Sequence, residues 1–95
     1  MNPIVLIVDD EKPTRDGLRQ ALDERFEVYV AADAREARQV LKSEPVDVLL
    51  TDLRLGTDSG MDLLDEALTL TTPPVSIMMT AYGSVETAVE AMRRG

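Results

Sequence analysis

The feature that most constrains this chain is an apolar run that ends in a carboxylate. Residues 46–52 read Val-Asp-Val-Leu-Leu-Thr-Asp. A run of this length that is rich in valine and leucine is typical of a strand buried on both faces, as in parallel sheets. Asp52 then stands at the carboxyl end of that strand, where open α/β sheets place their ligand sites.

Two other apolar runs are also followed by residues whose side chains could bind a ligand or take part in a reaction. Asp9, Asp10 and Glu11 follow residues 4–8, and Thr80 and Ala81 follow residues 75–79. Because the carboxyl ends of parallel strands meet at one edge of a sheet, we expect these groups to converge with Asp52.

Helical patterns separate the apolar runs. We expect helices from Pro13 to about Glu24, from Asp33 to about Ser43, and from Ser59 and Ser84 onward, with an edge strand at residues 26–30 and a loop at residues 53–57. Their inward faces are expected to carry Thr14, Leu18, Ala21 and Leu22, then Ala37, Val40 and Leu41, then Leu63, Leu64, Ala67 and Leu68, then Val85, Ala88, Val89 and Met92. Strands that alternate with helices predict one α/β domain over residues 1–95, an open parallel sheet with helices on both faces.

Composition excludes several kinds of protein. The 95 residues contain 10 basic and 18 acidic side chains, and a net charge of −8 argues against direct contact with nucleic acid. The chain has no cysteine and no histidine, which excludes disulfides, thiolate metal sites and a phosphohistidine on this chain. No run approaches the ~20 apolar residues of a membrane span, and no secretory signal opens the chain, so we expect a cytoplasmic protein.

The convergence of Asp9, Asp10 and Asp52 implies a cation. Two unit charges ~4 Å apart cost ~4 kcal/mol at an effective dielectric constant of 20, so something must offset the repulsion. Mg²⁺ favours carboxylates together with water and phosphate oxygens. A carboxylate beside such a cation can attack phosphorus and become an aspartyl phosphate. Thr80 is placed to donate its hydroxyl to a phosphoryl oxygen, and the small Ala81 leaves room for that group.

Taken singly, these residues have simpler interpretations. Asp-Asp-Glu after a strand is often a polar loop that leads into a helix, and Asp52 alone is as readily a helix cap as a site. The argument rests on their combination at the ends of successive strands.

The same segments resemble the receiver domain of bacterial two-component response regulators. The matching pieces are residues 7–11, residues 49–55, Gly60 and residues 78–83. Residues 80–95 resemble the nitrogen-regulator (NtrC-like) group in particular, in which a receiver controls an ATPase that activates σ54 transcription. The resemblance implies a flavodoxin-like (CheY-like) sheet of strand order 2-1-3-4, in a signalling domain that is not an enzyme in the usual sense.

The resemblance also implies a role for each candidate residue. Asp52 would accept a phosphoryl group from a sensor histidine kinase. Asp10, Asp52 and the backbone carbonyl of Arg54 would hold Mg²⁺, and Asp9 would contribute through water. Thr80 and Ala81 would contact the phosphoryl group and pass the signal to an output domain in the same protein, one expected to act in transcription.

Two departures from the family pattern stand out. Gly56 occupies a place where the family usually has proline. The family continues into a fifth strand that ends in Lys-Pro and a fifth helix, and neither Lys12 nor Lys42 matches that lysine. We therefore expect a piece of a longer regulator, with residues 75–79 as an exposed sheet edge that favours a dimer or domain exchange.

Two other functions remain open from the sequence. One is a receiver-shaped interaction module that is never phosphorylated, which the missing lysine favours and the intact acidic set disfavours. The other is a Mg²⁺-dependent phosphohydrolase of a different α/β type. That enzyme would want a second acid two residues after Asp52, where Arg54 stands.

Overall fold

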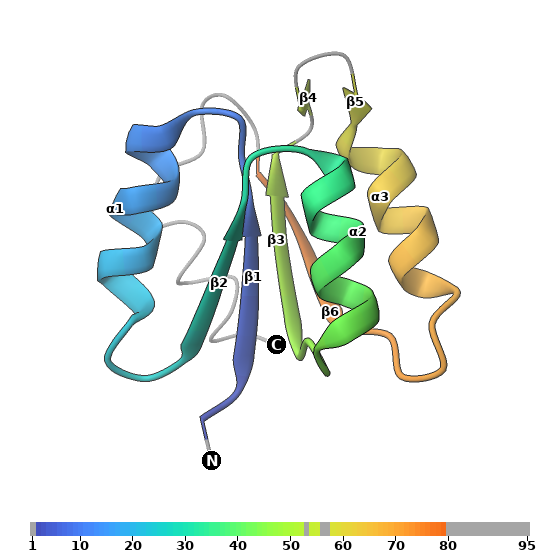
Figure 1. The fold of residues 1–95 in the computed structure, drawn as a ribbon, viewed down its shortest axis with the longest axis horizontal. Coiled ribbons are helices and arrows are strands. Elements are labelled where there is room, and N and C mark those ends of the chain that lie inside the picture. The colour runs from blue at the N-terminus through green and yellow to red at the C-terminus, as the bar shows by residue number, and fades with distance from the viewer. Residues whose placement is uncertain (1, 53, 56–57, 80–95) are drawn as a thin grey trace.

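The chain forms an open parallel sheet covered by helices on both faces (Figure 1). A computed structural model describes residues 2–52, 54–55 and 58–79. In chain order the elements are β1 (Ile4–Val8), α1 (Lys12–Leu22), β2 (Glu27–Ala31), α2 (Ala34–Ser43), β3 (Val48–Asp52), β4 (Arg54–Leu55), β5 (Asp58–Ser59), α3 (Gly60–Leu68) and β6 (Val75–Met79). The main sheet has the order β2-β1-β3-β6 with every pair parallel, which confirms the predicted order 2-1-3-4.

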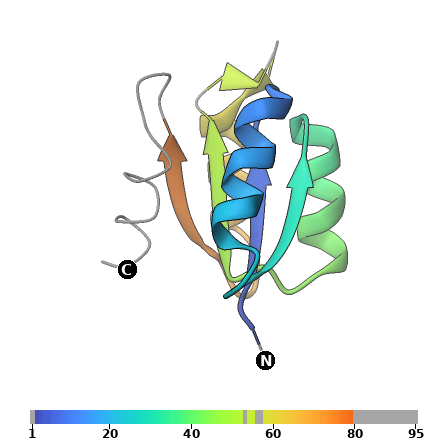
Figure 2. The same cartoon turned by 90° about the vertical axis from the view of Figure 1, so that its left-hand side faces the viewer.

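The central strand β1 is buried on both faces, and its side chains alternate between two cores. Leu6 and Val8 pack in the core beneath α2 and α3, whereas Val5 and Ile7 pack in the core beneath α1. Figure 2 shows α1 on one side of the sheet and α2 on the other. This two-sided burial explains why the strand is apolar at every position instead of at every second one.

Helix α2 begins at the residues that the sequence predicts. The Asp33 carboxylate accepts a hydrogen bond of 2.8 Å from the Glu36 backbone N–H, and the Glu36 carboxylate accepts one of 2.8 Å from the N–H of Ala32. The second bond reaches one residue further back than in the usual capping box. Ala37 is fully buried, and Val40 and Leu41 pack partly buried against the same core, as predicted.

Two residues predicted to face the core are exposed instead. Leu18 and Leu22 fill the contact between α1 and the sheet, while Ala21 lies outside this narrow contact. Leu68 is 58% exposed because it is the last residue of α3, one position beyond the buried Ala67. Leu63 is buried as predicted, and Leu64 is half-buried.

Several predicted boundaries also shift. Within the predicted loop, Arg54 and Leu55 form β4, which pairs in antiparallel fashion with β5 in the register Arg54 to Ser59 and Leu55 to Asp58. The second strand runs one residue later than predicted, and α1 spans Lys12–Leu22. The helix predicted from Ser84 onward lies outside the described residues.

Strand β6 is found where it was predicted. Within the described residues it pairs only with β3, and Val75 at its start is 47% exposed. Among the helices of the described chain, none is long and apolar enough to cross a bilayer.

Candidate functional site: an acidic cluster at the carboxyl edge of the sheet

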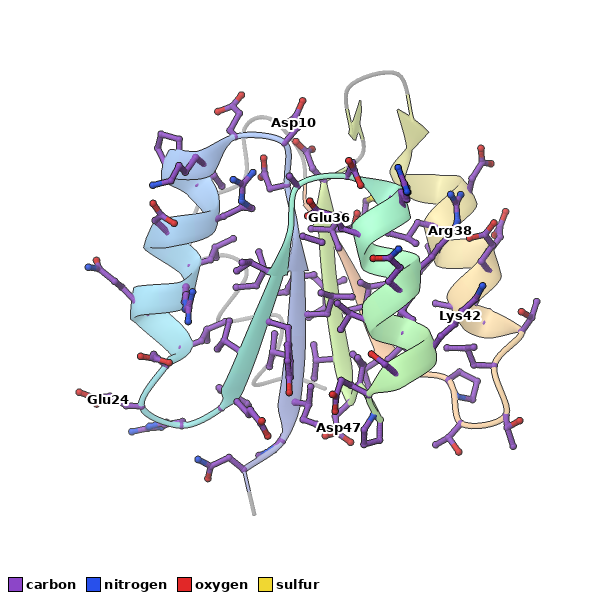
Figure 3. The ribbon with its side chains drawn as sticks, viewed as in Figure 1. Asp10, Glu24, Glu36, Arg38, Lys42 and Asp47 are labelled. Carbon is purple, nitrogen blue, oxygen red and sulfur yellow. The ribbon has the colours of Figure 1, made fainter. Side chains whose placement is uncertain are left out.

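Two neighbouring strands bring the three predicted aspartates together. Val8 of β1 lies beside Thr51 of β3 in the parallel register, so the residues that come next reach the same edge of the sheet. Asp9, Asp10 and Asp52 each offer a carboxylate oxygen, and these oxygens all lie within 4.8 Å of one another. Figure 3 places Asp10 at this edge and Asp47, which precedes β3, at the opposite one.

Asp9 is held on every side. Its backbone N–H donates to the carbonyl oxygen of Ala31 at 3.1 Å, and one carboxylate oxygen accepts the backbone N–H of Glu11 at 2.8 Å. Its carbonyl oxygen accepts a hydrogen bond of 2.7 Å from Nη1 of Arg15. With only 4% of its surface exposed, Asp9 is the buried member of the cluster.

Burial raises the pKa of the Asp9 carboxyl above its ordinary value. The hydrogen bond from the Glu11 N–H opposes the shift, while the negative charges of Asp52, Asp10 and Glu11 add to it. The carboxylates therefore repel one another in the folded protein, as expected for a group that a cation would stabilise.

The remaining two aspartates are open to solvent to different degrees. Asp10 is exposed, and Asp52 is half-buried at the end of β3. Thr51, fully buried beside it, donates its hydroxyl to the carbonyl oxygen of Asp52 at 3.1 Å. Asp52 thus combines a fixed backbone with a carboxylate that solvent can reach.

One residue of this region was missed from the sequence. Arg15 is not among the residues predicted to face the core or to belong to the site, yet it is half-buried and contacts the main chain of Asp9. Its position in the sequence could have indicated this contact, because Arg15 is a basic residue in the first turns of the helix that follows Asp9 and Asp10.

Comparison with known proteins decides the family. The profile of the "Response regulator receiver domain" family matches residues 5–95, nearly the whole chain. The chain belongs to this receiver-domain family. It is therefore part of a two-component response regulator, and its parallel sheet is the fold of that family.

Two curated relatives of this receiver domain are regulatory proteins. It is 40% identical over 91 residues to response regulator protein PilR of Pseudomonas aeruginosa, covering 95% of this chain and 20% of that protein. It is also 40% identical over 92 residues to regulatory protein AtoC of Escherichia coli, covering 96% of this chain and 20% of that protein. Both relatives are NtrC-family regulators, as the resemblance implies. The chain spans about a fifth of the length of these relatives.

A solved structure agrees with the sequence comparison. The receiver domain resembles the CheY-like response regulator receiver domain protein of Methanospirillum hungatei, with a TM-score of 0.81 and 33% identity. The match covers all of this chain and 77% of that one.

The structure of the receiver domain places some of the predicted site residues and leaves others untested. Asp9, Asp10 and Asp52 lie together as predicted. Arg54 lies in β4, two residues after Asp52, and its proposed carbonyl ligand stays a prediction. Thr80 and Ala81 lie outside the described residues.

The acidic cluster fits Mg²⁺ by the chemistry of its donors. Mg²⁺ takes hard oxygen ligands, commonly one or two carboxylates with water, and the cluster offers three carboxylates of graded exposure. Burial raises the pKa of Asp9, and the negative charges of Asp52 and Asp10 add to the shift, as expected of a carboxylate that a nearby cation would stabilise. Asp10 and Asp52 are the less buried members of the cluster, so they would hold the ion directly. The buried Asp9 would contribute through water.

Proposed function

We propose that this receiver domain accepts a phosphoryl group on Asp52 from a sensor histidine kinase, in the presence of Mg²⁺, and thereby switches an output domain. The observation that carries the proposal is the geometry of the cluster. Asp52, a half-buried residue, stands at the end of a core strand, and its carboxylate lies within 4.8 Å of two further carboxylates, in a chain of the response-regulator family.

The proposed reaction is a displacement at phosphorus. A carboxylate oxygen of Asp52 forms a bond to phosphorus while the bond from phosphorus to the imidazole nitrogen of the donor breaks. The electron pair stays on that nitrogen, which then takes up a proton. The product is an acyl phosphate on Asp52 and a free histidine on the kinase.

The neighbouring residues prepare Asp52 for this step. Thr51 restrains the main chain at the end of β3 through its hydrogen bond to the Asp52 carbonyl oxygen. When bound, Mg²⁺ supplies the positive charge that offsets the cluster and the incoming phosphoryl oxygens. Asp10 and the carbonyl of Arg54 complete the set of direct ligands that we propose for it, and Asp9 contributes through water.

Phosphorylation adds about −1.5 to −2 charges to a strand end that is already acidic. Such a charge can bias an element that has two arrangements. We assign the response to Thr80 and Ala81, which follow β6 in the sequence, since β6 lies next to β3 and pairs Met79 with Asp52. The output is proposed to be transcriptional, through a σ54-type ATPase elsewhere in a cytoplasmic regulator.

Intact-mass measurement tests this proposal. Incubation with acetyl phosphate and Mg²⁺ should add one phosphoryl group to the chain, and EDTA should prevent the addition. Asp52→Asn should remain unmodified, whereas Asp47→Asn, at the opposite end of the same strand, should be modified like the native chain.

Three results would overturn the proposal. An adduct on Asp52→Asn would place the acceptor elsewhere. A native chain that stays unmodified, although it is folded and binds Mg²⁺, would make an interaction module that is not phosphorylated the better account. Rapid release of inorganic phosphate without a stable adduct would instead point to a phosphohydrolase.

A further inference from the structure

The loop between β1 and α1 carries two of the three carboxylates, and the side chain of Arg15 connects it to the helix. Nη1 of Arg15 donates to the Asp9 carbonyl oxygen at 2.7 Å, across the start of α1. This carbonyl belongs to the peptide group that joins Asp9 to Asp10. The contact therefore fixes the orientation of the peptide from which Asp10 projects.

The other polar groups of Asp9 are already engaged. Its N–H is bonded to Ala31 on the neighbouring strand, and its carboxylate is bonded to the Glu11 N–H. Arg15 provides the remaining restraint, on the side of the residue that leads to Asp10. Without it, the Asp9–Asp10 peptide would keep no protein contact at its oxygen among the described residues.

Arg15 is itself firmly placed. Its backbone N–H donates to the Glu11 carbonyl at 3.1 Å, a bond of the first turn of the helix, and Pro13 stands in that same turn. Leu18 and Leu22 bury the helix against the sheet. Arg15, a half-buried residue, thus extends from a well-packed helix to the loop.

We propose that Arg15 is a positioning residue for Mg²⁺, which acts by holding the Asp9–Asp10 peptide so that both carboxylates face the ion together. This inference rests on the proposed function, and specifically on the binding of Mg²⁺ by the cluster. Groups behind metal ligands commonly contribute about 10- to 100-fold to metal affinity by fixing the direction of those ligands.

A purely electrostatic role for Arg15 predicts the opposite sign. A cation close to the cluster repels Mg²⁺, so removing it would tighten Mg²⁺ binding. If Arg15 acts by position, removing it loosens binding, because the ion must then order the loop itself. The direction of change therefore separates the two roles.

The experiment is calorimetric titration of the chain with MgCl₂. We expect Arg15→Met to lower Mg²⁺ affinity about tenfold. Arg15→Lys, which keeps the charge and one donor in reach, should restore affinity to within about threefold of the native chain. Arg19→Met, one turn further along the same helix on its exposed face, is the matched control and should leave affinity unchanged.

Phosphorylation by acetyl phosphate gives a second readout. The rate for Arg15→Met should fall at limiting Mg²⁺ and recover at saturating Mg²⁺, since only the ordering of the metal ligands has been impaired. If Arg15→Met does not fold, Arg15→Gln, which keeps a shorter neutral donor, takes its place and should bind more weakly than Arg15→Lys.

The outcomes are distinguishable. The positioning role would be overturned if Arg15→Met bound Mg²⁺ as tightly as the native chain or more tightly. The same holds for Arg15→Gln if that variant is used because Arg15→Met does not fold. Either result would leave the proposed function intact. A native chain that binds no Mg²⁺ would overturn the metal site of the proposed function and this inference with it.

Discussion

At the scale of single residues, the site depends on one buried carboxylate among accessible ones. The type and spacing of Asp9, Asp10 and Asp52 were sufficient to predict their convergence, because parallel strands must bring their carboxyl ends to one edge. The graded burial of the three could not be predicted. It depends on how the loop after β1 folds back under the Glu11 N–H and the Arg15 side chain.

Asp9→Asn should make the protein more stable at pH 7 without Mg²⁺. The pKa of Asp9 is raised in the folded state, so the charged form weakens folding above that pKa. The free energy of unfolding of the native chain should therefore rise as pH falls through the pKa of Asp9 in the folded state. The difference in stability between Asp9→Asn and the native chain should shrink over the same pH range. Urea unfolding in EDTA from pH 7 downward measures the difference.

The hydrogen bond to Glu11 provides the internal control for this variant. Asparagine keeps an oxygen that can accept the Glu11 N–H, whereas Asp9→Ala removes it and should gain less stability or lose some. A native chain that is more stable than Asp9→Asn in EDTA at pH 7 would contradict the account. Added Mg²⁺ should stabilise the native chain more than the variant.

At the scale of elements, local signals predicted the sheet well and the outer helix surfaces less well. Strands β1 and β6 have the predicted bounds, and the Asp33 cap is confirmed. Periodicity nevertheless placed Ala21 and Leu68 inward, because an apolar residue near the edge of a helical stripe does not reveal where the neighbouring sheet ends. The pairing of β4 with β5 was also not predicted, because a strand of two residues is too short to show an alternation of apolar and polar residues in the sequence.

The cap of α2 offers a test at this scale. Asp33→Ala should lower the free energy of unfolding by about 1 kcal/mol, because the Glu36 N–H loses its partner. Asp33→Asn should retain most of the stability. Asp23→Ala is the control, because Asp23 follows the end of α1 and its replacement removes a negative charge from a helix C-terminus. This substitution should not lower the free energy of unfolding. Equal losses in Asp33→Ala and Asp23→Ala, measured by chemical denaturation, would exclude capping as the cause.

At the scale of the whole molecule, the alternation of strands and helices was enough to predict the architecture. Right-handed crossovers leave few ways to arrange such a chain, and the structure has the strand order implied by the family resemblance. How the domain associates with other molecules depends on its surface, which the pattern of apolar residues does not specify.

Self-association through β6 stays a prediction, with a direct test. Val75, 47% exposed at the start of this strand, should promote pairing between copies, and Val75→Lys should reduce it because edge lysines block strand pairing. Leu68→Lys, also at an exposed apolar residue but on α3, serves as the control. Sedimentation at high concentration should show association in the native chain and in Leu68→Lys, and less in Val75→Lys. A native chain that is monomeric throughout would refute the prediction.

The most direct test of the central claim identifies the modified residue in the native chain. Sodium borohydride reduces an acyl phosphate to an alcohol, which converts an aspartyl phosphate into homoserine. After treatment with acetyl phosphate and Mg²⁺, reduction and peptide sequencing by mass spectrometry should find homoserine at position 52 and aspartate at positions 9 and 10. Homoserine at position 9 or 10, or at no position in a chain that binds Mg²⁺, would contradict the assignment of Asp52 as the phosphoryl acceptor.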